Sequence, residues 1–168
     1  DASYMDFNEA HAISKGFGMS LGPNVHGEMI EYGRRPPGFP LLVALLMSFG
    51  TPIMTASIII TSVTYAMVPV FIFLIFKHFV SDIKAALAAF AVLIHPALIY
   101  YSKIAAPEIV GILILCATYY YYIRFIDNQE TKNENYIWST LLLGFILGLT
   151  IWFRYVNAIY IVVFPALI

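Results

Sequence analysis

The stretch from Pro36 to Phe76, PPGFPLLVALLMSFGTPIMTASIIITSVTYAMVPVFIFLIF, contains no charged residue and decides the fold class. It is too long for one ordinary membrane span, which needs about 20 apolar residues. The segment Gly50-Thr51-Pro52 divides it into two pieces. Phe39 to Phe49 is short enough for a re-entrant or interfacial helix, whereas Ile53 to Phe76 can cross a bilayer. The sequence therefore predicts an integral membrane protein.

Composition agrees with this interpretation. The 168 residues are 61% hydrophobic and 11% charged, whereas about 25% are charged in soluble domains. A net charge of −1 gives no support for nucleic-acid binding, which relies on basic surfaces. The lone Cys116 lies in an apolar run and has no partner for a disulfide in this chain. We expect it to pack as a small apolar residue.

The rest of the chain alternates between apolar runs and polar turns, so we predict an all-α, polytopic transmembrane helical bundle. Residues 1–52 form an extracytoplasmic first loop with short interfacial helices, the first of which stops at Gly16. His95-Pro96 predicts a kink, and Arg124 to Asn135 predicts a polar loop. Because the last apolar run is cut at Ile168, we expect a piece of a longer membrane protein. The predicted spans within residues 53–168 are 53–76, 85–101, 108–123, 137–153 and 155–168.

Alternation of these spans places the isolated charges on one side of the membrane. Charges near hydrocarbon cost about 2.5–3.5 kcal/mol each at a helix centre, so they tend to mark function. The count of Lys and Arg in the two sets of loops is nearly equal, so the positive-inside rule does not decide the orientation. If the basic residues of the charged side serve a site, the other side is cytoplasmic. The isolated charges are Asp1, Arg34-Arg35, Glu108 and Arg154.

The arginines suit a phosphate ligand. The planar guanidinium forks of Arg34 and Arg35 can donate paired hydrogen bonds to phosphate oxygens, and the prolines that follow fix the backbone there. The alternative is that both side chains anchor the protein at lipid headgroups. Arg154, between two apolar runs, is open to the same two interpretations.

Asp1 and Glu108 are the candidate carboxylates for general-base chemistry towards an acceptor hydroxyl or amine. Glu108 also has a purely structural explanation, because it follows Pro107 at a helix N-terminus, where negative charge is favourable. No metal site is predicted, although a divalent cation stays open. The residues His11, His26, Glu28 and Glu31 match no tight ligand spacing.

The order of these segments resembles the GT-C superfamily of polyprenyl-phosphate-dependent glycosyltransferases. Within it, the chain is most similar to the branch of protein O-mannosyltransferases and lipid A aminoarabinose transferase. One departure is Ala2, where many relatives carry a second acidic residue, a role that is then vacant or falls to Asp6. The matching segments are Asp1-Ala2-Ser3-Tyr4 with Glu9-Ala10 and Gly16, then Arg35-Pro36-Pro37-Gly38, Pro107-Glu108, and Gly144 to Leu149 followed by Arg154.

This resemblance implies an inverting transfer of a sugar from a polyprenyl- or dolichyl-phosphate donor to a protein, lipid or glycan acceptor. Asp1 would be the catalytic base, and Glu108 would help to position the acceptor or the sugar. The lipid phosphate would be held by Arg34, Arg35 and Arg154, with further positioning by Tyr4, Asp6 and Lys103. The implied location is a multi-pass protein among membrane lipids, in a prokaryotic plasma membrane, with an extracytoplasmic active face.

A transporter or lipid-handling protein without catalysis is the alternative. Charges that face a shared cavity also suit translocation, and interrupted apolar segments mark transporter sites. However, the isolated charges gather at one rim of the membrane rather than at its midplane. This placement favours the enzyme.

Overall fold

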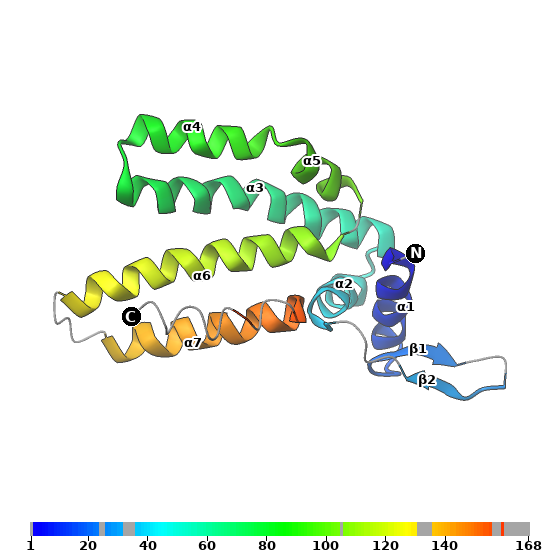
Figure 1. The fold of residues 1–168 in the computed structure, drawn as a ribbon. Helices are drawn as coiled ribbons and strands as arrows, with labels where there is room; N and C mark the ends of the chain where they lie inside the picture. The colour runs from blue at the N-terminus through cyan, green and yellow to red at the C-terminus, as the bar shows by residue number, and fades with distance from the viewer. Residues whose placement is uncertain are drawn as a thin grey trace.

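The computed structural model describes residues 2–23, 26–31, 36–104, 106–130, 136–155 and 159. Figure 1 shows a layer of long helices with a small β-hairpin at one end. The elements of the described part are, in chain order, α1 (Ala2–Ser14), β1 (Ser20–Pro23), β2 (Met29–Glu31), α2 (Gly38–Ser48), α3 (Ile53–Phe79), α4 (Asp82–Leu93), α5 (Pro96–Lys103), α6 (Pro107–Glu130) and α7 (Tyr136–Phe153).

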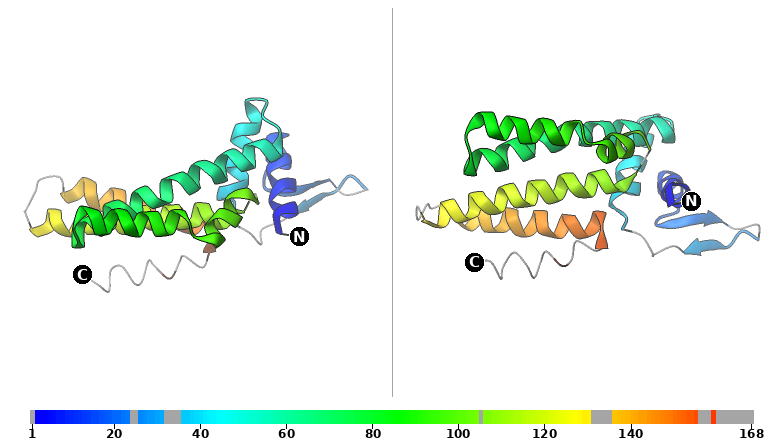
Figure 2. Two further views of the ribbon diagram at one scale, coloured as in Figure 1. Left: turned by 90° about the horizontal axis from the view of Figure 1, so that it is seen from above. Right: turned by 45° about the horizontal axis from the view of Figure 1, so that its top comes forward.

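The long helices lie side by side in the order α4, α3, α6, α7 (Figures 1 and 2). α4 runs antiparallel to α3 and α7 runs antiparallel to α6, whereas α3 and α6 run in the same direction. The antiparallel hairpin β1–β2, α1 and α2 are all at one end of this layer. The α3–α4 turn and the end of α6 are at the other end. This arrangement gives the bundle two distinct end faces.

Membrane crossing is supported by length and composition. Within the described residues, α3 and α6 are long and apolar enough to span a membrane, and the pair α4–α5, bent by 52°, would make a third span. α7 is a shorter apolar helix. The predicted all-α membrane bundle is thus confirmed, with the hairpin as a small addition. The division of the chain at residue 52 into a loop and a membrane part stays a prediction.

The predicted breaks are found, with some differences in length. Gly16 has a φ of 81° just after α1, and Gly50 has a φ of 84° just after α2, a conformation that favours glycine at helix ends. The kink at His95-Pro96 separates α4 from α5. In contrast, the polar loop expected from Arg124 begins as helix, since α6 continues to Glu130. Its last turns are amphipathic rather than apolar, so hydropathy does not mark their helical structure.

Side chains of α3 donate hydrogen bonds to backbone carbonyls on both sides of the break between α4 and α5. The Tyr65 hydroxyl donates a hydrogen bond to the Leu93 carbonyl at the end of α4. The hydroxyl of Thr61, which is fully buried, lies 2.9 Å from the Ser102 carbonyl near the end of α5. Polar backbone groups in a bilayer must find such internal partners. The bent pair is therefore fixed to α3 at two points.

A tightly packed junction joins α2 to the end of α7. A Cβ built on Gly38 would lie 2.7 Å from the carbonyl oxygen of Trp152 and 2.9 Å from Cγ of Phe153. Phe39 is buried directly after Gly38, in a core cluster that includes Ile109 of α6. Close approach at Gly38 thus brings the segment before α2 next to the end of α7.

Candidate functional site

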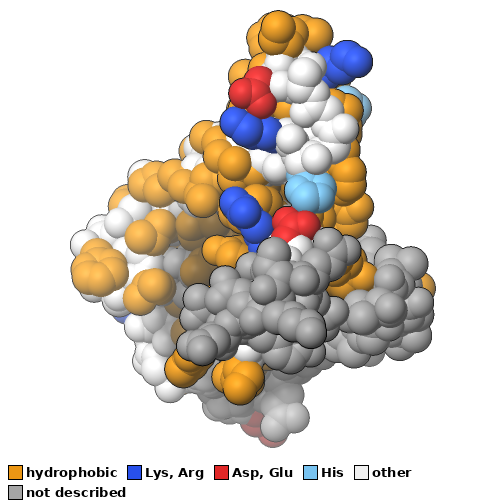
Figure 3. All heavy atoms as spheres, turned by 90° about the vertical axis from the view of Figure 1, so that its left-hand side faces the viewer, with side chains coloured by type: hydrophobic (Ala, Val, Ile, Leu, Met, Phe, Trp, Pro, Cys, Tyr) orange, Lys and Arg blue, Asp and Glu red, His pale blue; other side chains and the backbone are white. Residues whose placement is uncertain are grey.

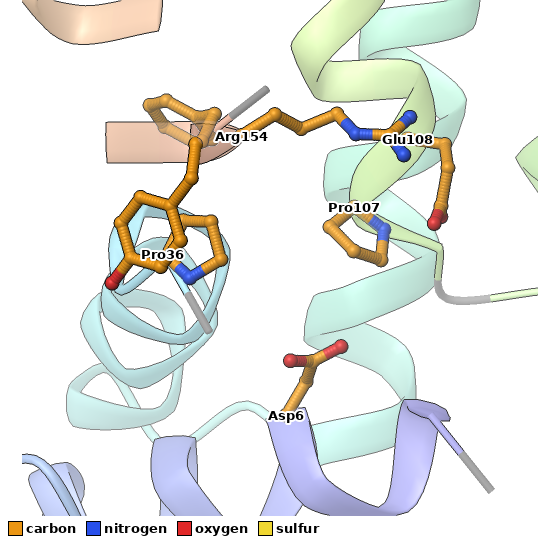
Figure 4. Close-up of a pocket in the computed structure, with 7 residues that line it drawn as sticks. Asp6, Pro36, Pro107, Glu108 and Arg154 are labelled. Atoms are coloured by element: carbon orange, nitrogen blue, oxygen red, sulfur yellow. The ribbon is translucent and has the colours of Figure 1, made fainter. Parts of the chain in front are cut away.

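A pocket of about 210 Å³ opens where α1, α6 and the end of α7 meet. Figure 4 shows two carboxylates and one guanidinium around it. They come from parts of the chain more than forty residues apart, so only the tertiary fold brings them together. The lining residues are Asp6, Pro36, Pro107, Glu108, Phe153, Arg154 and Tyr155.

Asp6 comes from the middle of α1 and points from that helix towards the turn that holds Pro107 (Figure 4). Its exposed fraction is 2%, and Glu9, one helical turn later, is 1% exposed. Buried carboxylates are costly and tend to be kept where they serve a purpose. Asp6 is thus better placed for chemistry than its position in a polar loop suggested.

Glu108 lies in the first turn of α6, directly after Pro107. Proline suits this position because its fixed φ matches a helix and it has no N–H to leave unpaired. The partial positive charge of the helix N-terminus favours a carboxylate there. The same local structure therefore stabilises Glu108 and directs it to the pocket.

Arg154 follows the last residue of α7, and its side chain extends towards the start of α6 (Figure 4). Its aliphatic stem lies over Gly111, because a Cβ built on Gly111 would be 3.1 Å from Cδ and 3.2 Å from Cγ of Arg154. Gly111 is one helical turn after Glu108. The missing side chain on α6 thus creates the space that lets the guanidinium reach the pocket.

The predicted site residues fall into three groups. Asp6, Glu108 and Arg154 are brought together in one pocket. Lys103 ends α5 with an exposed side chain and does not line that pocket. Tyr4 lies in α1, but its side chain is not among those described. The others lie outside the described residues, and these are Asp1, Arg34 and Arg35.

One described neighbour of these residues belongs to the site. Pro36, directly after Arg35, lines the pocket, and α1 begins directly after Asp1. Sequence reasoning missed the lining side chains Phe153 and Tyr155 and the role of Gly111. Only the proximity of Phe153 and Tyr155 to Arg154 in sequence could have indicated them.

The described part of the chain contains no group of three or more His, Cys, Asp or Glu side chains arranged to hold a metal ion. The pocket itself combines two carboxylates with a cation. A carboxylate can accept a proton or a hydrogen bond from a hydroxyl, and a guanidinium can hold an anionic oxygen. This set of groups suits a reaction that joins a hydroxyl to a group carried on a phosphate.

The fold and this pocket define a helical membrane protein with a polar site at one rim of its bundle. Residues 34–168 match the model of the dolichyl-phosphate-mannose-protein mannosyltransferase family, and the chain belongs to this family. The resemblance to the GT-C superfamily is thereby confirmed. Comparison with curated proteins and with solved structures gives no match. The family consists of membrane glycosyltransferases that use dolichyl-phosphate sugar donors.

Proposed function

We propose that this protein transfers a sugar, with inversion, from a polyprenyl- or dolichyl-phosphate donor to an acceptor hydroxyl. The acceptor is a protein, lipid or glycan. The observation that carries the proposal is the pocket in which Asp6, Glu108 and Arg154 converge from three distant segments. The family match supports the class of donor.

Inversion requires a single displacement at the anomeric carbon. A carboxylate takes the proton of the acceptor hydroxyl while its oxygen attacks that carbon. The bond from the carbon to the phosphate oxygen breaks, and its electron pair leaves with the lipid phosphate. We assign the base to Asp1, at the start of α1, because α1 also carries Asp6 into the pocket.

The leaving phosphate gains negative charge during this step, so cations next to it stabilise the transition state. Arg154 is one such cation. We assign the same role to Arg34 and Arg35, because the segment that follows them enters the pocket wall at Pro36. Glu108 and Asp6 then position the acceptor or the sugar hydroxyls, with Tyr4 and Lys103 as outer members of the site.

A transfer assay tests these roles. Membranes that contain the protein are incubated with labelled dolichyl-phosphate mannose, and with other polyprenyl-phosphate sugars, and labelled products are separated from the donor. We expect Arg154→Gln to lower the transfer rate by about 10²-fold, the usual effect of removing one group that stabilises transition-state charge. Glu108→Gln should lower it as well.

Matched controls lie at the opposite end of the bundle. Lys84→Gln removes a cation and Asp82→Asn removes a carboxylate, and both residues are exposed there. They should leave transfer unchanged. Equal losses in the control and pocket variants would contradict the assigned roles, and transfer that survives Asp1→Asn would refute the assignment of the base.

Localisation has its own test. We propose that the pocket faces the extracytoplasmic side of a prokaryotic plasma membrane. In intact cells, a cysteine introduced at Lys15 should react with a membrane-impermeant maleimide, and one at Lys84 should not. The reverse pattern would contradict this orientation.

A further inference from the structure

A second polar pocket lies between α3 and α6 at the other end of the bundle. Its volume is about 300 Å³. Figure 3 views this end, where basic, acidic and histidine side chains gather on a mainly apolar surface. The lining residues are Phe73, Leu74, Lys77, His78, Tyr120, Ile123 and Arg124.

Arg124 joins this pocket to a neighbouring one between α6 and α7. That neighbour has a volume of about 360 Å³ and shares Arg124 and Tyr120 with the first. Among the lining residues that the structure describes, neither pocket has an Asp or Glu. The candidate glycosyl-transfer pocket, in contrast, has two carboxylates. The charged side chains that line these two pockets are therefore basic and complement an anion.

Such an anion can replace the present partners of Arg124, Lys77 and His78. Arg124 donates a hydrogen bond of 3.2 Å to the neutral Tyr120 hydroxyl. Lys77 lies 3.3 Å from Asp82, but both side chains are more than half exposed. His78 lies 3.7 Å from Asp127, also at the surface. Exposed ion pairs contribute only about 0–1 kcal/mol, so a well-placed anion can compete with them.

The position of the pocket indicates an amphiphile rather than a free ion. Lys77 and His78 lie in the last turn of α3, and one turn deeper Phe73 and Leu74 form an apolar wall. Tyr120 belongs to a run of four tyrosines on α6, of a kind that marks the membrane–water interface. α6 lines both pockets, and the rise along its axis from Glu108 to Arg124 is about 24 Å, so the two pockets lie near opposite ends of the bundle.

We propose that this end of the bundle binds the headgroup of an anionic phospholipid from the leaflet opposite to the glycosyl-transfer site. The phosphate diester lies between Arg124 and Lys77, and an acyl chain follows the wall of Phe73 and Leu74. Basic pockets between membrane helices are suited to such headgroups. The site is separate from the proposed transfer reaction and does not depend on it.

Thermal unfolding of the purified full-length protein in detergent tests this site. Phosphatidylglycerol and phosphatidylcholine with the same acyl chains are titrated separately, because a ligand that binds the folded state raises the unfolding midpoint. Phosphatidylglycerol should raise the midpoint more. Arg124→Gln and Lys77→Gln should each weaken the apparent affinity for phosphatidylglycerol by about tenfold, as expected for the loss of one hydrogen bond to a charged group.

Lys84→Gln is the matched control, because it removes one charge from the same end without touching either pocket. It should keep the full response to phosphatidylglycerol. An equal loss in this variant would overturn the proposal in favour of general surface charge. Equal stabilisation by the two lipids would overturn it as well. So would an equal shift with inorganic phosphate at the same phosphate concentration, which would indicate a site for the free anion.

Discussion

Replacing Gly38 by alanine tests the junction that holds one wall of the candidate glycosyl-transfer pocket. The new methyl carbon would lie 2.7 Å from the carbonyl oxygen of Trp152 and 2.9 Å from Cγ of Phe153. The first of these atoms belongs to the backbone of α7 and cannot rotate away. Either α2 or the end of α7 must therefore move by several tenths of an ångström.

The expected cost follows from two opposing effects. Adding a methyl group to a tightly packed site costs about 1–3 kcal/mol. Alanine in place of glycine inside a helix stabilises the folded protein by about 0.5–1 kcal/mol, and by less at a first-turn position such as Gly38. We therefore expect Gly38→Ala to destabilise the protein by about 1–2 kcal/mol. We also expect transfer to fall by about tenfold or more, since small displacements of site residues have large kinetic effects.

The assay is thermal or denaturant unfolding in detergent, together with the transfer assay. Gly144→Ala and Gly148→Ala are matched controls within α7, because a Cβ at either position would meet no described atom within 4 Å. Both should stabilise the protein by about 0.4–1 kcal/mol, the usual gain where alanine fits without strain. If Gly38→Ala is as stable as these variants, the close approach of α2 to α7 is wrong.

Two further variants test the supports of the site. Thr61→Val removes the buried hydroxyl that lies 2.9 Å from the Ser102 carbonyl; we expect a loss of about 0.6–1.7 kcal/mol in unfolding, the range for hydrogen bonds between membrane helices. Thr61→Ser keeps the hydroxyl and should keep the stability, so equal losses in both variants would count against this bond. Gly111→Ala places a carbon 3.1 Å from Cδ of Arg154, a flexible side chain that can move aside. Unfolding should change by less than about 1 kcal/mol, whereas the KM for the lipid-phosphate donor should rise; an unchanged KM would show that the position of Arg154 does not matter for the donor.

The amino-acid sequence alone indicates the membrane bundle and several of its break points. The charge-free stretch from Pro36 to Phe76 contains α2 and α3, separated at Gly50 as expected. These features are local, because apolar length, glycine and proline act on the chain where they stand. The hairpin of β1 and β2 was not foreseen, because its strands have only four and three residues and show no clear alternation.

The pocket was harder to foresee than the helices. Alternation of spans predicts only that Glu108 and Arg154 share one side of the membrane. Their meeting with Asp6 depends on how α1 packs at the end of the bundle and on the space above Gly111, which are long-range properties. The second polar pocket was not anticipated either, since Arg124 was interpreted as the start of a polar loop.

The broken helix pair α4–α5 has a consequence for how the protein is made. Ribosomes deliver α3 before α4, so the hydroxyls of Thr61 and Tyr65 are already in the membrane when the break arrives. They can then donate hydrogen bonds to the carbonyls of Leu93 and Ser102 at once. Without α3, the same segment would present unpaired polar backbone to lipid. α3 thus acts as a built-in insertion partner that receives the broken pair as it enters the bilayer.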